Sequence, residues 1–233
     1  MKMKKFSVIL TYWERPELLS RALYCLVQQT YGNFEVVPSF DGHSSPGLWV
    51  YDQFLWHLRR DHHYHKKHQY AANFRPPVVF NSGERGHHGN SCRRHALSYC
   101  NGDYVIWYGH DNLIDKDFLE THGRQIQDDS CVSVVGQHYF TNRYDAGCRT
   151  KPENYISYRG RLPFLEPGEK EFKKRGTIDL LQYAVPLDVA KRWAFLEEDW
   201  PTYEADWQTL VSIRKNEPDL EVRVNPAPVC SHF

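Results

Sequence analysis

The stretch Gly102-Asp-Tyr-Val-Ile-Trp-Tyr-Gly-His-Asp-Asn112 decides how this chain is interpreted. It follows the turn residue Asn101 and runs through apolar and aromatic residues that favour a buried strand. It ends on one carboxylate, Asp111, between small and polar neighbours. Open α/β sheets bind ligands at the carboxyl ends of their strands. The stretch therefore predicts a buried strand that carries Asp111 to a binding edge.

The composition indicates an ordinary globular protein. The chain has 233 residues and a formal net charge of zero, which suits one large domain. Balanced charge gives no footprint for nucleic acid or a membrane surface, so we expect neither as a partner. The apolar run Phe6–Leu10 is too short for a secretion signal, and we expect no transmembrane segment. Six cysteines without a Cys-x-x-Cys pair indicate free thiols, and we expect a cytoplasmic protein.

Predicted strands and helices alternate through residue 135. The strands are indicated by apolar runs, and the helices by apolar residues at helical spacing. Strands are expected at residues 5–11, 34–40, 78–80, the central stretch, 132–135 and 221–224, with mixed structure at 177–185. Helices are expected to begin at Pro16 and Pro46 and to span about 90–100, 115–127, 186–193 and 203–214. This order predicts the α/β class, with a mostly parallel sheet and helices on both faces.

Two features interrupt this regular pattern. Pro38 lies within a predicted strand, and a strand proline favours an edge or a bulge because it has no ladder donor. Residues 141–175 consist of turn residues and mixed charges. A structureless length of that size inside a domain is more often a functional lid than a linker, so we expect a flexible loop there.

Three polar residues follow predicted strands: Thr11, Asp41 and Asp111. Each alone is as easily a cap or turn residue, but the three would meet at one rim of a parallel sheet. Carboxylate oxygens are hard ligands that suit Mg²⁺ or Mn²⁺, with water and substrate phosphates in the remaining positions. Such a metal neutralises charge on a departing phosphate. His232, late in the chain, is a candidate for a further ligand.

Other residues invite functional interpretations. Four histidines form a His-rich segment: His62, His63, His65 and His68. They lack the spacing of a structural zinc site, and a solvated basic helix end is the favoured interpretation. Aromatic residues that could stack on a base or a sugar are Tyr12, Trp13, Trp107, Tyr108 and Trp200. Trp107 and Tyr108 alternate across a strand, so only one of them is expected to face the site.

Three segments resemble the opening of glycosyltransferase family 2: Phe6-Ser-Val-Ile-Leu-Thr-Tyr-Trp-Glu-Arg-Pro-Glu-Leu-Leu19, Gln28-Gln-Thr-Tyr31 and Phe40-Asp-Gly42. The later block Asn90-Ser-Cys-Arg-Arg-His-Ala-Leu-Ser-Tyr-Cys-Asn-Gly-Asp-Tyr-Val-Ile106 is similar to the helix and strand before the family's Asp-x-Asp metal motif. The resemblance extends over about residues 6–120. It implies a GT-A fold in a single domain and an inverting transfer from a nucleotide diphosphate sugar, a UDP-sugar in the commonest case.

The resemblance also implies roles for residues of the first half, 1–115, which would hold the nucleotide sugar. Thr11 and Asp41 would contact the base, with Tyr12 and His110 as further contacts to the donor. Arg85 and Arg93 both lie where the family places a basic residue near the diphosphate, and the choice between them stays open. Asp111 matches the acid that binds Mn²⁺ or Mg²⁺. The preceding acids are replaced by Gly109 and His110, so the motif is only DXD-like.

The second half, 116–233, would hold the acceptor, a carbohydrate or another hydroxyl compound. Within Tyr203-Glu-Ala-Asp-Trp207, Asp206 occupies the place of the family's catalytic base, with Glu204 as second choice. Alternatively, both acids only favour the N-terminal end of a helix through its dipole. A base there would deprotonate the acceptor of a hexosyltransferase-type reaction.

Two rival functions remain open on the sequence. A nucleotidyltransferase would carry a Gly- and Arg-rich phosphate loop after the first strand, which Thr11-Tyr-Trp-Glu-Arg-Pro16 lacks. A catalytically inactive nucleotide- or sugar-binding module is compatible with the loss of acids at Gly109 and His110. Transfer or hydrolysis of a donor in the presence of Mn²⁺ separates an active transferase from such an inactive module.

Overall fold

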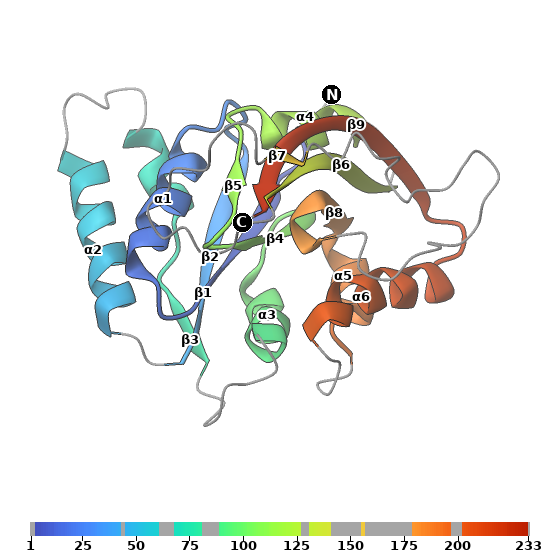
Figure 1. Cartoon of the computed structure of the whole chain (residues 1–233), viewed down its shortest axis with the longest axis horizontal. Helices are drawn as coiled ribbons and strands as arrows, with labels where there is room; N and C mark the ends of the chain where they lie inside the picture. The colour runs from blue at the N-terminus through green and yellow to red at the C-terminus, as the bar shows by residue number, and fades with distance from the viewer. Residues whose placement is uncertain are drawn as a thin grey trace.

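A continuous sheet crosses the molecule and is flanked by helices on both faces (Figure 1). The computed structural model describes residues 3–42, 45–60, 68–80, 89–126, 131–140, 155–156, 179–196 and 202–232. In this part of the chain the strand order is β3-β2-β1-β4-β8-β6-β9-β5, and β7 pairs with β6. The strands are β1 (Phe6–Tyr12), β2 (Phe34–Asp41), β3 (Val78–Phe80), β4 (Tyr104–Gly109), β5 (Leu113–Ile114), β6 (Cys131–Phe140), β7 (Tyr155–Ile156), β8 (Tyr183–Pro186) and β9 (Glu221–His232).

The sheet has a parallel half and a mixed half. Strands β3, β2, β1 and β4 are parallel neighbours. Strand β8 runs antiparallel to both β4 and β6, and β6 pairs in parallel with β9. The short strands β5 and β7 pair antiparallel with β9 and β6. The predicted α/β class with a mostly parallel sheet is therefore confirmed, and the mixed half is built from the less regular C-terminal part.

Two apolar clusters hold the helices against the sheet. The helices are α1 (Pro16–Val27), α2 (Ser45–Arg60), α3 (Asn90–Ala96), α4 (Phe118–Gln125), α5 (Leu187–Trp193) and α6 (Thr202–Asn216), with 3-10 turns η2 (His68–Asn73), η4 (Leu97–Tyr99) and η6 (Leu180–Gln182). One cluster joins α1, α2 and α4 to one face, and the other joins α3, α5 and α6 to the opposite face. Figure 1 shows α1 and α2 (blue to cyan) on one side of the strands and α5 and α6 (orange) on the other.

The central stretch forms β4, as predicted, and both of its aromatic residues are buried. Trp107 and Tyr108 are 1% and 0% exposed and belong to the two opposite clusters. The expectation that one of them faces the site is wrong, because helices cover both faces of β4. The indole of Trp107 packs edge-on against Tyr183 and Phe195, at ring-centroid distances of 5.8 and 5.4 Å.

The last predicted strand is much longer than expected. Residues 221–224 were expected, and β9 continues to His232 past two prolines. Its partner β6 shifts register at Gly136, where Val135 pairs with Asn225 but Gly136 pairs with Pro228. This irregularity lets the ladder pass residues that have no donor. As a result, β9 reaches the edge where β4 ends.

Pro38 in β2 lies at a position that strand β3 does not pair with. Pro38 pairs with Leu10 of β1, whereas β3 pairs only with Ser39–Asp41. Pro38 therefore lies just before the span covered by β3, although β2 is not an edge strand along its whole length. This position suits a residue that cannot donate to a ladder.

A buried carboxylate fixes the opposite, amino-terminal edge of the sheet. The side chain of Glu35 is 4% exposed and accepts hydrogen bonds from Ser7 Oγ (2.6 Å), Arg75 Nε (2.8 Å) and Lys5 Nζ (3.0 Å). Its burial raises the pKa, but these donors and the backbone N–H of Asn101 outweigh it, so the pKa lies below its ordinary value. This network joins β1, β2 and the turn before β4.

Two further expectations can be compared with the structure. Cys25, Cys92, Cys100, Cys131 and Cys230 are free thiols. Among the described residues no helix is long and apolar enough to cross a membrane. The expected loop at 141–175 lies outside the described residues apart from β7, and so do most of the His-rich segment and Trp200.

Candidate active site

The parallel register brings the candidate residues of three strands to one edge. Thr11 pairs with Ser39 of β2 on one side and with Gly109 of β4 on the other. Asp41 ends β2 two residues beyond Ser39. The turn after β4 is tied to β1, because the backbone N–H of His110 donates to the carbonyl of Thr11 at 3.0 Å. Thr11, Asp41 and the Gly109–Asn112 turn therefore share the carboxyl edge, as predicted.

The Gly109–Asn112 turn is held from within. Asn112 N–H donates to the Gly109 carbonyl at 3.0 Å, and Tyr108 Oη donates to the Asn112 carbonyl at 3.1 Å. Arg21 on α1 adds a longer contact of 3.4 Å to the carbonyl of Asp111. Within the turn, these contacts involve only backbone atoms, so none of them occupies the side chain of Asp111 or Asn112.

The glycine of the turn makes room for the carboxylate. A Cβ atom at Gly109 would lie 2.9 Å from Asp111 Oδ1 and 3.1 Å from Asn112 Nδ2. Both distances are tighter than ordinary van der Waals contact. The carboxylate of Asp111 therefore folds back over the position where a side chain at 109 would stand. A side chain at position 109 would therefore require the ends of the Asp111 and Asn112 side chains to shift.

His110 is held as a neutral ring. It is 9% exposed, packs edge-on against Tyr12 at a centroid distance of 5.2 Å, and has its Nδ1 3.2 Å from the carbonyl oxygen of Thr11. Burial lowers the pKa of the imidazole, although the charge of Asp111 works against this shift. A carbonyl only accepts hydrogen bonds, so Nδ1 carries the proton and Nε2 presents a lone pair. Tyr12 itself is 1% exposed and supports the ring from the core.

A second group of polar residues lies on the α3 side of the edge. Gly89, at a φ of +84°, precedes α3 and approaches β1 so closely that its added Cβ would lie 3.3 Å from Thr11 Cγ2. Asn90 is 2% exposed, and its Oδ1 accepts from Arg93 Nη1 at 3.1 Å. Ser39 Oγ donates to the Cys92 carbonyl at 3.0 Å and fixes the helix to β2. Sequence reasoning missed Asn90, although it lay within the block that carried the family resemblance.

Several buried polar atoms at this edge have no hydrogen-bond partner. Within the described residues, four of them lack a hydrogen-bond partner here: Thr11 Oγ1, Asn90 Nδ2, His110 Nε2 and Asn112 Oδ1. A buried polar group without a partner costs about 1–3 kcal/mol, so such a set is expected where a ligand supplies the missing partners. Gln137 Nε2 on β6 has the same property. Only Thr11 and His110 were site candidates from the sequence; isolated polar residues such as Gln137 carry no sequence signal.

Asp206 lies on the same face of the sheet as α3. Its Oδ2 accepts from the backbone N–H of Leu180 at 3.4 Å, and Tyr183 Oη donates to its carbonyl at 3.1 Å. Burial raises the pKa of Tyr183, and the charges of Asp206, Asp179 and Arg93 act on the same phenol. Asp206 and Arg93 therefore lie in one electrostatic neighbourhood around Tyr183. Asp179, which caps η6 through the N–H of Leu181 at 2.8 Å, is a further acid that the sequence did not reveal.

The Gly109–Asn112 turn offers oxygen atoms of the kind that bind divalent cations. Asp111 offers a carboxylate and Asn112 an amide oxygen without a partner, which are hard donors of the kind that Mg²⁺ and Mn²⁺ accept. The pairing of Leu113 with Ser231 also places the backbone of His232 beside Asn112. Among the described side chains no group of three His, Cys, Asp or Glu residues forms a metal cluster, and the side chain of His232 is not among them.

Of three other candidates from the sequence, the structure describes the side chain of one. Arg85 lies outside the described residues. Glu204 belongs to α6, but its side chain is likewise outside the described set. Arg93 is described and lies next to Asn90. Of the two arginines, it is the one that the structure connects to the carboxyl edge.

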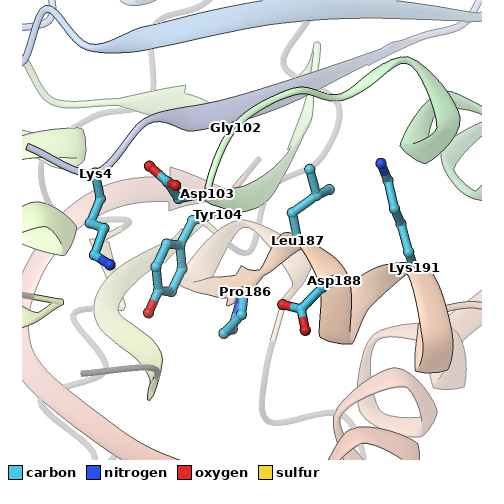
Figure 2. A pocket seen from close by; sticks show the side chains of 8 residues that line it. All are labelled: Lys4, Gly102, Asp103, Tyr104, Pro186, Leu187, Asp188 and Lys191. Atoms are coloured by element: carbon cyan, nitrogen blue, oxygen red, sulfur yellow. The ribbon is translucent and has the colours of Figure 1, made fainter. Parts of the chain in front are cut away.

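A separate pocket opens at the opposite edge of the sheet. It has a volume of about 400 Å³ and is lined by Lys4, Gly102, Asp103, Tyr104, Pro186, Leu187, Asp188 and Lys191 (Figure 2). Asp103 Oδ2 accepts from the backbone N–H of Lys5 at 2.6 Å, and Lys191 Nζ donates to the Cys100 carbonyl at 3.3 Å. None of the unpartnered buried atoms found in the described residues belongs to this lining. The pocket is therefore a surface hollow at the amino edge, remote from the candidate site.

Solved structures share this arrangement of sheet and helices. Residues 1–349 of TarS from S. aureus in complex with UDP match with a TM-score of 0.67 and 17% identity, over 97% of this chain and 60% of that one. The complex of TarS 1–349 with UDP-GlcNAc gives 0.64 and 17%, over 97% and 58%. The mannosyltransferase PcManGT from Pyrobaculum calidifontis, in complex with GDP-Man and Mn²⁺, gives 0.64 and 14%, over 99% and 57%. The fold is that of the GT-A glycosyltransferases.

The family follows from the sequence of the central part. The model of glycosyl transferase family 2 matches residues 60–184, more than half of the chain, so the chain belongs to that family. A search among curated proteins finds no match. The chain spans about 60% or less of the length of the solved relatives named above. The matched segment contains Asn90, Arg93 and the Gly109–Asn112 turn.

Proposed function

We propose that this glycosyltransferase moves a hexosyl group from a nucleotide diphosphate sugar to an acceptor hydroxyl, with inversion at the anomeric carbon and with a divalent metal. The observation that carries the proposal is the set of unpartnered buried atoms on Thr11, Asn90, His110 and Asn112. A nucleotide offers both donors and acceptors, which such a set needs. The donors of the solved relatives, UDP-GlcNAc and GDP-Man, are of this class.

The nucleotide half of the donor is assigned to the first half of the chain. Thr11 and Asp41 would contact the base, with Tyr12 supporting the ring of His110 behind them. Arg93 would face the diphosphate, because its guanidinium is permanently charged and lies beside Asn90. Arg85 remains the alternative for this role. The lone pair on His110 Nε2 would accept from a hydroxyl or N–H of the donor.

Asp111, Asn112 and His232 are the residues that would hold Mn²⁺ or Mg²⁺. A cation bound there would neutralise the charge that develops on the departing diphosphate. The folded-back carboxylate of Asp111 is compatible with this role, because Gly109 leaves its oxygens unobstructed by a neighbouring side chain. One carboxylate suffices for Mg²⁺ or Mn²⁺ when water and phosphate oxygens complete the shell.

Asp206 is the proposed base, with Glu204 as the alternative. The acceptor hydroxyl gives its proton to the carboxylate as its oxygen bonds to the anomeric carbon, and the bond from that carbon to the diphosphate oxygen breaks. The contact from the Leu180 N–H orients one oxygen of Asp206. Base catalysis of this kind contributes about 10²–10⁴-fold in rate.

The test is a screen of UDP- and GDP-sugars for transfer or donor hydrolysis with and without Mn²⁺, on three proteins. Wild type should turn over at least one donor, and Asp206→Asn should lose about 10²-fold or more while still binding it. Asp188→Asn, an exposed acid on α5, is the matched control and should behave as wild type. Unchanged turnover in Asp206→Asn would reject this residue as the base and point to Glu204. Binding without turnover of any donor would favour an inactive module.

A further inference from the structure

The amide of Asn90 has a fixed orientation. Its Oδ1 lies 3.1 Å from Arg93 Nη1, and a guanidinium only donates hydrogen bonds. The oxygen and nitrogen of the amide are therefore distinguished by chemistry, without the ambiguity that usually attends an asparagine. Nδ2 must point away from Arg93 with its two N–H groups. It is buried and finds no hydrogen-bond acceptor among the described residues.

Asn90 shares its surroundings with two residues of the carboxyl edge. Gly89, the preceding residue, approaches Thr11 so closely that an added Cβ would lie 3.3 Å from Thr11 Cγ2. The Oγ of Ser39, two residues before Asp41 on β2, donates to the carbonyl of Cys92, two residues after Asn90, at 3.0 Å. Thr11 Oγ1 is itself a buried atom without a partner. Strand β2 and helix α3 thus bring an obligate acceptor on Asp41 and an obligate donor on Asn90 to the carboxyl edge near Thr11.

We infer that Asn90 reads the base of the nucleotide donor and selects bases that carry a carbonyl next to a ring N–H. The amide of Asn90 donates to the carbonyl oxygen, while the carboxylate of Asp41 accepts from the ring N–H. Uracil presents this pair at N3 and O4, and guanine presents it at N1 and O6. Cytosine and adenine present the reverse, an exocyclic amino group next to an unprotonated ring nitrogen. Against those two bases, donor would face donor and acceptor would face acceptor.

The inference rests on the proposed function and makes the choice of donor nucleotide specific. A buried N–H left without an acceptor carries a penalty of about 1–3 kcal/mol, which corresponds to a factor of about 5–150 in binding. The mismatch at Asp41 adds to it, so uridine and guanosine diphosphates should bind at least about tenfold more tightly than cytidine and adenosine diphosphates.

The test measures the dissociation constants of UDP, GDP, CDP and ADP by calorimetry, in the presence of Mn²⁺. Wild type is compared with Asn90→Asp, which keeps an oxygen towards Arg93 but replaces the donating nitrogen with a second oxygen. In this variant UDP and GDP should weaken by about tenfold or more, and the preference over CDP should collapse. Asn33→Asp is the control at the opposite edge of the sheet, where Nδ2 donates to the Met3 carbonyl at 2.9 Å. It should keep the wild-type order.

Two different failures are distinguishable. Equal affinities of wild type for UDP and CDP, or an unchanged series in Asn90→Asp, would overturn the inference while leaving the proposed function in place. Absence of binding by all four nucleotides would overturn both. The wild-type series needs no variant, so the inference stays testable even if Asn90→Asp folds poorly.

Discussion

Gly109→Ala is a minimal change at the point where this chain departs from the acidic motif of its family. The added Cβ would stand 2.9 Å from Asp111 Oδ1, a separation that real Cβ atoms essentially never show, and 3.1 Å from Asn112 Nδ2. Relief requires the carboxylate to retreat by about 0.5 Å. Since a misplacement of about 1 Å costs about 10²-fold in rate, we expect kcat/KM with Mn²⁺ to fall by about tenfold.

The assay is donor turnover as a function of Mn²⁺ concentration, with unfolding by urea measured in parallel. Gly32→Ala is the control, because its added Cβ would meet Tyr70 at an ordinary 3.6 Å. Both variants should unfold within about 1 kcal/mol of wild type, and only Gly109→Ala should need more Mn²⁺ and turn over more slowly. Full activity of Gly109→Ala at wild-type Mn²⁺ concentrations would refute the claim that glycine makes room for the carboxylate.

Two further predictions concern stability. His122 is fully buried beside Ser133 Oγ at 2.8 Å, and burial lowers its pKa from 6.5 to about 3. The unfolded chain therefore binds a proton at mildly acid pH that the folded chain does not, so stability falls as pH drops; between pH 7 and pH 5 this histidine should account for a loss of about 2 kcal/mol. The measurement is urea unfolding at pH 7 and pH 5. His122→Gln should lack this loss of unfolding free energy, and the exposed control His57→Gln should keep it. Equal losses in wild type and both variants would contradict the prediction. Glu35→Gln removes the charge shared by three side-chain donors and the backbone N–H of Asn101. It should lower the unfolding free energy by about 2–3 kcal/mol at pH 7, since Lys5 and Arg75 stay about one-third exposed. A change below about 0.5 kcal/mol would show that the network contributes little.

The parallel half of the fold was predictable because its signals are local. Strand β1 and the strand β4 that precedes Asp111 are indicated by their apolar runs, and the helix α1 is indicated by apolar residues at helical spacing and by the first-turn proline Pro16. Their common edge then follows from the parallel sheet alone. The extent of β9 was not predictable, because it depends on a register shift at Gly136 in a partner that is distant in sequence.

The candidate site was predictable where strand ends define it and unpredictable where tertiary contacts do. Thr11 lies near the end of β1 and Asp111 follows β4, so their place at the edge can be deduced. Asn90 becomes informative only because Arg93 fixes its amide, and His110 only because the Thr11 carbonyl fixes its tautomer. Both depend on distances in the folded chain, which no spacing in the sequence encodes.

The central claim is that the carboxyl edge binds a nucleoside diphosphate with a divalent metal at Asp111. Thermal unfolding with UDP or GDP, with and without Mn²⁺, tests it most directly, because a ligand that binds only the folded state raises its stability. At about 100 times the dissociation constant, the nucleotide with Mn²⁺ should raise the Tm of wild type by about 5–10 °C. Asp111→Ala should lose the part of the shift that depends on Mn²⁺. An equal shift in Asp111→Ala, or none in wild type with either nucleotide, would contradict the account.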